Sequence, residues 1–119
     1  MHFQRPPHAQ AKLVRCTAGS IYDVALDLRA DSPTFKQWQA VELTATNRLM
    51  LFIPEGFAHG FQTLEDNTEV LYQMGDYFDP ELSSGVRWDD PTFGIEWPGE
   101  SNEERVINQR DRELPDFPG

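Results

Sequence analysis

Alternation of side chains along residues 21–28 constrains the fold of this chain more than any other feature. Every second residue there is bulky and mostly apolar, which places four side chains on one side of an extended segment: Tyr22, Val24, Leu26 and Leu28. The opposite side carries Ile21, Asp23, Ala25 and Asp27. A period of two is the repeat of a β-strand, so the pattern predicts a strand with one buried face. No stretch longer than two turns has the 3.6-residue period of a helix.

Further strand signals follow at short intervals along the chain. Apolar and β-branched residues predict strands over residues 12–17, 37–44, 49–53, 58–63, 68–74 and 95–97. The short turn at residues 18–20 predicts a hairpin between the first of these and residues 21–28. Such spacing is typical of a sandwich or barrel, and a jelly roll is the natural small version. Residues 99–105 are polar and acidic, which predicts a surface excursion.

Length and composition limit the class of protein. The 119 residues predict a single domain, 1–119, and 39% hydrophobic residues suffice for a packed core. No apolar run approaches the ~20 residues of a membrane helix, and no signal peptide opens the chain. The single Cys16 excludes an internal disulfide, as expected for a reducing cytoplasm. A net charge of −10 argues against a nucleic-acid binder.

Charge is distributed unevenly between the two halves of the chain. Residues 1–63 hold five acidic and six basic residues, whereas the remainder holds fifteen acidic residues and four arginines. Two interpretations fit this distribution equally well. The C-terminal half presents a solvated acidic surface, or the scarce cations of the first half bind an anionic ligand.

Histidines are the first candidates for chemistry, because histidine is the usual general base near neutral pH. The chain contains three: His2, His8 and His59. Residues 54–59 have the pattern P-x-G-x-x-H, which is the spacing of a second metal motif in cupins. Metal binding by the scattered histidines therefore stays open, beside the simpler interpretation of His59 as a hydrogen-bonded, half-buried strand residue.

Two tyrosines and an aspartate are less distinctive. Tyr72 fits a core position with a satisfied hydroxyl group, and Tyr77 could offer a flat ring for stacking. Asp111 lies in a polar tail, where a solvated charge is the ordinary interpretation. The residues by themselves therefore predict a ligand-binding β-sandwich and no specific reaction.

Six segments, however, occur in an order that resembles one enzyme family. They are HFQRPPHAQAKLVR (2–15), SIYDVALDLR (20–29), SPTFKQW (32–38), IPEGFAHGF (53–61), LYQMGDYFDP (71–80) and DDPTFGIEWP (89–98). Together they closely resemble dTDP-4-dehydrorhamnose 3,5-epimerases over nearly the whole chain. The resemblance implies an all-β fold of the cupin type, a jelly-roll β-sandwich or barrel.

The resemblance also implies a reaction. The family inverts carbons 3 and 5 of a dTDP-linked 4-keto-6-deoxy sugar without metal or cofactor, in dTDP-rhamnose and polysaccharide biosynthesis. Both carbons adjoin the ketone, so their protons become removable when a base is in contact and the enolate oxygen is stabilised. A cytoplasmic homodimer is implied as well, with no nucleic-acid or membrane partner.

Specific residues match the family's functional positions. His2 matches the base, Asp111 in the tail of residues 99–119 its dyad partner, and Lys12 the lysine beside the sugar oxygen. Tyr72 matches the proton donor on the opposite side of the sugar ring. Four more positions match substrate contacts: His59, Tyr77, Arg110 and Gln4. Of these, Tyr77 matches the aromatic residue that stacks on thymine.

The chain also departs from the family pattern. Family members carry further strands before the base, so we expect an N-terminally shortened domain, either as a shortened homologue or through a misassigned start. If the chain truly begins at Met1, we expect a poorly held His2 and weak or absent activity. Ser83 stands where many members have a ligand-binding glutamate. The alternatives are an epimerase of a single carbon, a non-catalytic sugar-nucleotide-binding homologue and a metal-dependent cupin.

Overall fold

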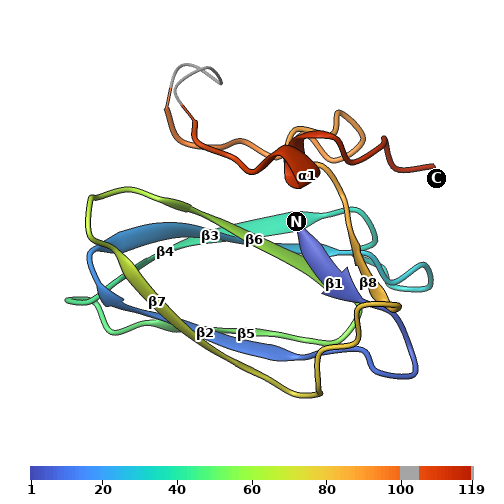
Figure 1. Cartoon of the computed structure of the whole chain (residues 1–119), viewed down its shortest axis with the longest axis horizontal. Helices are drawn as coiled ribbons and strands as arrows, with labels where there is room; N and C mark the ends of the chain where they lie inside the picture. The colour runs from blue at the N-terminus through green and yellow to red at the C-terminus, as the bar shows by residue number, and fades with distance from the viewer. Residues whose placement is uncertain (100–104, 119) are drawn as a thin grey trace.

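The computed structural model describes residues 1–99 and 105–118 and contains, in that part of the chain, two antiparallel sheets and one short helix. The strands are β1 (His2–Gln4), β2 (Lys12–Ala18), β3 (Ser20–Asp27), β4 (Trp38–Thr44), β5 (Met50–Ile53), β6 (Phe57–Thr63), β7 (Glu69–Met74) and β8 (Ser83–Gly85), and α1 spans Gln109–Arg112. One sheet has the order β4-β3-β6-β1-β8 and the other the order β5-β2-β7. The two sheets face each other as a sandwich (Figure 1).

This arrangement confirms the prediction of an all-β jelly roll. Strands β2 to β7 occupy the predicted segments to within one residue at each end. The elements β1, β8 and α1 were not predicted, because three or four residues are too few to show a period. The strand predicted at residues 95–97 is wrong: Ile95 and Trp97 instead pack against the outer side of the five-stranded sheet.

The predicted hairpin between residues 12–17 and 21–28 is also wrong. Strand β2 pairs with β5 and β7, whereas β3 pairs with β4 and β6 in the opposite sheet. Gly19 makes the crossing with φ +73°, and a Cβ there would lie 2.4 Å from Oγ1 of Thr68. Ser20 and Ile21 are both buried immediately after the turn. The chain therefore enters a second buried sheet there and does not fold back along the first.

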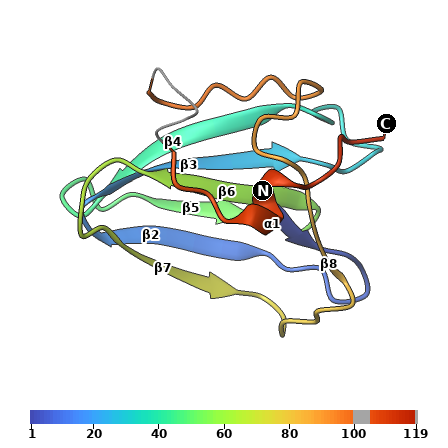
Figure 2. The same cartoon turned by 45° about the horizontal axis from the view of Figure 1, so that its top comes forward.

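Strand β3 is buried on both faces, whereas one buried face was predicted. Between the sheets, Ile21 and Ala25 pack with residues of β2 and β5. On the other side, Val24 and Leu26 are covered by the segment that follows β8, including Phe93. Figure 2 shows this C-terminal segment, in orange and red, crossing the five-stranded sheet before it reaches α1. The sandwich thus has two apolar cores, and the second one fixes the path of the C-terminal segment.

A polar cluster holds the end of β3. Asp27 accepts hydrogen bonds from the backbone and side chain of Arg29 and from the hydroxyl groups of Ser32 and Thr34. The Arg29 guanidinium also lies 4.8 Å from the ring centroid of Phe57, the first residue of β6. The turn after β3 is therefore tied to the start of the neighbouring strand.

Of the predicted surface excursion at residues 99–105, residues 100–104 lie outside the described part of the chain. Arg105, which follows them, donates a hydrogen bond to the carbonyl group of Pro98 at 2.8 Å. Among the described residues, no helix has the length and apolar character needed to cross a membrane.

Candidate active site

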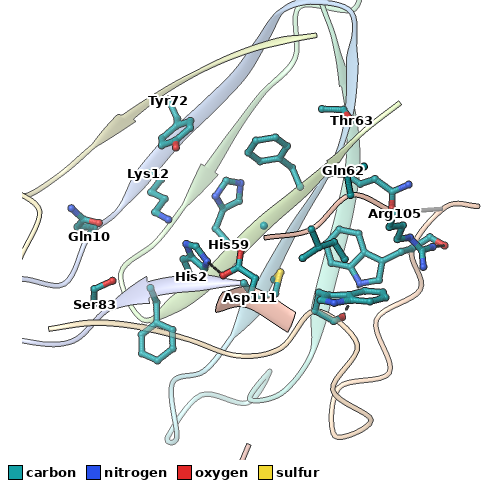
Figure 3. Close-up of a pocket in the computed structure, with 18 of the residues that line it drawn as sticks. His2, Gln10, Lys12, His59, Gln62, Thr63, Tyr72, Ser83, Arg105 and Asp111 are labelled. Carbon is teal, nitrogen blue, oxygen red and sulfur yellow. Dashed lines mark hydrogen bonds and ion pairs between the residues drawn. The ribbon is translucent and has the colours of Figure 1, made fainter. Parts of the chain in front are cut away.

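A cavity of about 750 Å³ opens between the two sheets, with β1 and β6 on one side and β2 and β7 on the other. Its lining combines imidazole, ammonium, phenol and carboxylate groups from elements that are distant in sequence: His2, Lys12, His59, Tyr72 and Asp111. Figure 3 shows these side chains converging on the same space. The sandwich therefore gathers both acidic and basic groups around a volume large enough for a small ligand.

His2 lies in β1, which is paired on both sides, with β6 and with β8. Its Nε2 lies 2.7 Å from Oδ1 of Asp111, a hydrogen bond marked in Figure 3. The preceding Met1 is buried, and its carbonyl group accepts the N–H of Val86 at 2.9 Å. The expectation of a poorly held His2 is therefore wrong for its backbone, which is held by two neighbouring strands and an apolar anchor.

Asp111 lies in α1, and the chain just after α1 approaches β8 through Leu114. The Asn108 side chain caps this helix by accepting the N–H of Asp111 at 2.8 Å. Gly85 leaves room for the contact, since a Cβ there would lie 2.9 Å from the Met1 oxygen and 3.1 Å from Cδ1 of Leu114. The absence of a side chain at Gly85 therefore lets the C-terminal segment lie close enough for Asp111 to reach His2.

A second imidazole–carboxylate pair lies beside the first. His59 in β6 is the strand partner of both His2 and Ala25, so the imidazoles of His2 and His59 share one face of the sheet. Asp23 lies on the same face of β3, two residues from Ala25, and its Oδ1 is 2.5 Å from Nε2 of His59. Both members of this pair are buried, and Asp23 is completely inaccessible.

The opposite sheet contributes an ammonium group and a phenol. Tyr72 pairs with the buried Val14, which lies two residues from Lys12 along β2, so Lys12 and Tyr72 share one face of this sheet. Both line the cavity, which makes this the inner face. Lys12 is 7% exposed, and its amino group has no hydrogen bond or ion pair with any residue that the structure describes. Burial lowers the pKa of Lys12, and the negative charge of Asp23 opposes that shift. The Tyr72 hydroxyl points toward Lys12 and His59 (Figure 3).

This geometry meets the requirements for moving a proton next to a carbonyl group. The imidazole of His2, backed by a carboxylate, can act as a general base, and Tyr72 from the facing sheet can act as a general acid. The ring centroids of His59 and Tyr72 are 6.3 Å apart, so the two sheets approach closely across the cavity. The buried Lys12 ammonium group, which has no bonded partner among the described residues, can stabilise a developing negative charge.

Three other residues matched to substrate contacts lie differently. Tyr77 is 91% exposed in the loop after β7, and Arg110 is exposed on α1; neither lines the cavity. Gln4 does line it, but its amide is held by backbone groups. It donates to the carbonyl groups of His8 and Tyr77 and accepts the N–H of Asp79. In this structure Gln4 therefore anchors the loop that carries Tyr77.

Several cavity residues were missed from the sequence. Gln10, Gln62, Trp88 and Arg105 all line the cavity. Asp23 was assigned to no role, although an aspartate inside an otherwise apolar strand signals either an exposed face or a functional site. The hydrophobic alternation of β3 favoured the first explanation, and the burial of both faces shows that it does not apply.

Each of the three histidines is bonded to a different aspartate, since His8 Nδ1 lies 3.1 Å from Oδ2 of Asp76. Within residues 1–99 and 105–118, no three histidine, cysteine, aspartate or glutamate side chains are grouped as metal ligands would be. The arrangement of the histidines thus differs from the shared site that a metal-binding cupin pattern would need.

Comparisons with known proteins agree with this geometry. The family model for dTDP-4-dehydrorhamnose 3,5-epimerase matches residues 1–118. A protein of that name from Salmonella typhimurium is 52% identical over 98 residues, which cover 82% of this chain and 54% of the relative.

Two solved structures extend the comparison to three dimensions. The Bacillus anthracis dTDP-4-dehydrorhamnose 3,5-epimerase, solved with TDP and PPi bound, matches with a TM-score of 0.92 and 46% identity, covering 98% of this chain and 65% of that one. A Legionella pneumophila dTDP-6-deoxy-D-glucose-3,5-epimerase in complex with dTDP-4-keto-L-rhamnose matches with a TM-score of 0.85 and 40% identity, covering 92% and 57%. These matches confirm the cupin-type jelly roll.

The chain spans 54% to 60% of the length of the first curated relatives that it matches. Within that span, the agreement extends from the first strand to the residues after α1. Because the family model covers nearly every residue and the same sandwich recurs at 46% identity, the chain belongs to the dTDP-4-dehydrorhamnose 3,5-epimerase family.

Proposed function

We propose that this chain epimerises a dTDP-linked 4-keto-6-deoxy sugar, converting dTDP-4-dehydro-6-deoxy-D-glucose to dTDP-4-dehydro-L-rhamnose. One observation carries the proposal: the His2 imidazole, bonded to Asp111, shares a cavity with the Tyr72 phenol of the facing sheet. The same cavity holds the Lys12 ammonium group, which has no bonded partner among the described residues. Family membership supports the reaction class, and the keto-sugar nucleotide in the Legionella complex supports the substrate class.

In the proposed mechanism, His2 removes the proton from a carbon adjacent to the ketone, and Asp111 stabilises the imidazolium that forms. The electron pair of the broken C–H bond moves onto the ketone oxygen, where the Lys12 ammonium group stabilises the enolate. Tyr72 then donates its proton to the other face of the same carbon, which inverts that centre. The His2 imidazolium then releases its proton to water, and the Tyr72 phenolate takes a proton from water, which restores both groups.

The remaining matched residues are proposed as substrate contacts. The exposed Tyr77 ring is proposed to cover the nucleotide base, and Gln4 fixes the loop that presents it. Arg110 adds a positive charge to α1 beside the dyad, where it can approach the diphosphate. His59 contacts the sugar from the cavity wall.

A cytoplasmic homodimer is proposed with this function, acting on a sugar nucleotide and needing no nucleic acid or membrane. The outer face of the three-stranded sheet supports the dimer. It exposes apolar side chains that share one side of paired strands: Met50, Phe52 and Leu71. Neighbouring exposed apolar groups of this kind are typical of a surface that another chain covers.

Deuterium incorporation into the substrate tests the reaction. In D₂O, NMR should show exchange at carbons 3 and 5, and His2→Asn or Tyr72→Phe should slow it by about 10²- to 10⁴-fold. Matched controls are His8→Asn, which breaks another His–Asp pair outside the cavity, and Tyr22→Phe, which removes a hydroxyl bonded to the Glu96 carbonyl group.

The outcomes separate the alternatives. Exchange at a single carbon would make the chain a single-carbon epimerase, and tight dTDP binding without exchange would make it a non-catalytic homologue. Loss of activity with a chelator, restored by one metal, would favour a metal-dependent cupin. The same assay on a version extended by the family's N-terminal segment tests the expected weakness of the short form, since equal rates would contradict it.

A further inference from the structure

The hydrogen bond between His2 and Asp111 depends on where a very short helix lies. Helix α1 has four residues and none of them is buried, so burial of its own side chains does not fix it in the sandwich. A single turn of helix is also marginal by itself in water. Arg112 on α1 donates to the carbonyl groups of Arg105 and Ile107, which ties the helix to the chain before it. The position of the Asp111 carboxylate therefore needs further contacts that fix α1 relative to β1.

Arg87 supplies such contacts to the chain that follows α1. Its Nη1 donates to the Leu114 carbonyl group at 3.3 Å, and its Nη2 lies 2.7 Å from Oδ1 of Asp116. Its Nε donates to Oδ1 of Asp89, a neighbour in the sequence, and its side chain is 24% exposed. The three nitrogens of one planar guanidinium are thus all engaged, which fixes the direction in which Arg87 holds the chain after α1.

The residues just before Arg87 hold the other member of the dyad. Gly85 of β8 is the strand partner of His2, and the N–H of Val86 bonds to the carbonyl group of Met1 at 2.9 Å. This short stretch therefore contacts the chain on both sides of the dyad. Its backbone holds the strand of His2, and the Arg87 side chain holds the segment that follows α1.

A second attachment of the same segment lies farther from α1. Asp90 Oδ2 accepts the N–H of Phe117 at 2.7 Å, and the ring centroid of Phe117 lies 5.2 Å from that of Phe93. This attachment anchors the end of the tail against the apolar core, whereas the carbonyl group that Arg87 holds is closer in sequence to Asp111. Arg87 does not line the cavity, so it is not placed to touch a ligand there.

We infer that Arg87 is a positioning residue of the candidate site: it ties the chain after α1 to the strand beside His2 and so holds the Asp111 carboxylate within bonding distance of the imidazole. The inference rests on the proposed function only for its effect on the rate, because the contact between His2 and Asp111 can be measured without substrate. A hydrogen bond at 2.7 Å would be lost if the helix moved away by about 1 Å. A misplacement of that size can cost a reaction about 10²-fold.

Nuclear Overhauser contacts test the positioning without substrate. In the unchanged chain, the ring protons of His2 should show contacts to the β protons of Asp111, and Arg87→Ala should abolish them. Arg87→Lys keeps the charge but not the planar array of donors, so it should restore the contacts in part. The matched control Arg29→Ala removes an arginine that is also paired with an aspartate, at the end of β3, and should leave the His2 contacts unchanged.

Overhauser contacts that persist in Arg87→Ala would overturn the inference. Should that variant not fold, Arg87→Gln is measured in its place and should lose the same contacts. It removes the charge that faces Asp116 and keeps a donor for the Leu114 carbonyl group.

Kinetics show whether Arg87 acts through the dyad. Deuterium exchange by Arg87→Ala should slow at least about tenfold through kcat with little change in KM, and Arg87→Lys should recover part of the rate. In the Asp111→Asn background, Arg87→Ala should cause little further loss, because both changes act on one contact. Additive losses would contradict the inference. If the unchanged chain shows no exchange, the proposed function fails, and the Overhauser contacts still decide the role of Arg87.

Discussion

Replacing Asp27 by asparagine should lower the free energy of unfolding by about 2–4 kcal/mol at pH 7. The carboxylate is 1% exposed and accepts five hydrogen bonds, three of them from Arg29. A hydrogen bond to a charged group contributes about 1.5–3 kcal/mol, against 0.5–1.5 kcal/mol for a neutral one, so each bond weakens by roughly 1 kcal/mol. The total is discounted because the Arg29 side chain is 43% exposed and its charge is screened.

The effect should depend on pH in a definite direction. The Arg29 guanidinium, with the Ser32 and Thr34 hydroxyl groups, holds the pKa of Asp27 well below its usual value. In the unfolded chain the carboxyl group titrates near pH ~4, so its stabilising contribution is present above that pH and is lost as the pH falls toward the folded-state value. Urea unfolding monitored by tryptophan fluorescence should show a constant difference between the two proteins above about pH 5 and a shrinking one below about pH 4. A difference of equal size at low pH would refute the reasoning, because it would reflect shape and not charge.

Three other substitutions test how the fold positions the residues of the candidate site. Asp111→Asn should slow deuterium exchange by about 10²-fold or more with little change in the urea midpoint, because it removes the charge that supports the His2 imidazolium; an unchanged rate would exclude the dyad. Gln4→Ala should accelerate hydrogen exchange at the Asp79 amide and weaken dTDP binding measured by calorimetry, since that side chain bridges to the loop of Tyr77; normal protection of Asp79 would contradict the anchoring role. Gly85→Ala should cost about 1–3 kcal/mol of stability and reduce exchange, because the new methyl group meets the Met1 oxygen and Leu114; a fully active protein would show that α1 can shift without loss.

Much of the fold could be predicted from the sequence because six strands are long enough to show a period. The error at the turn around Gly19 arose because a short Gly-containing turn can either close a hairpin or cross between sheets. What decides between them is the burial of Ser20 and Ile21 against residues far along the chain. The error at residues 95–97 has a similar cause, since apolar residues that cover a sheet resemble residues that form one.

The site was predictable only through the family resemblance. Local patterns gave no reason to join Asp111 to His2, because the contact depends on a capped turn of helix and on the small size of Gly85. Asp23 escaped notice for a related reason: its alternation with apolar residues is the pattern of a half-exposed strand, and only the C-terminal cover makes both faces interior.

The contact between His2 and Asp111 joins positions that are 109 residues apart in the sequence. During synthesis His2 leaves the ribosome 109 residues before its carboxylate partner, and the segment that covers β3 emerges between them. A nascent chain can therefore form most of the sandwich before it acquires a complete dyad. The proposed dyad is therefore complete only after α1 has been synthesised.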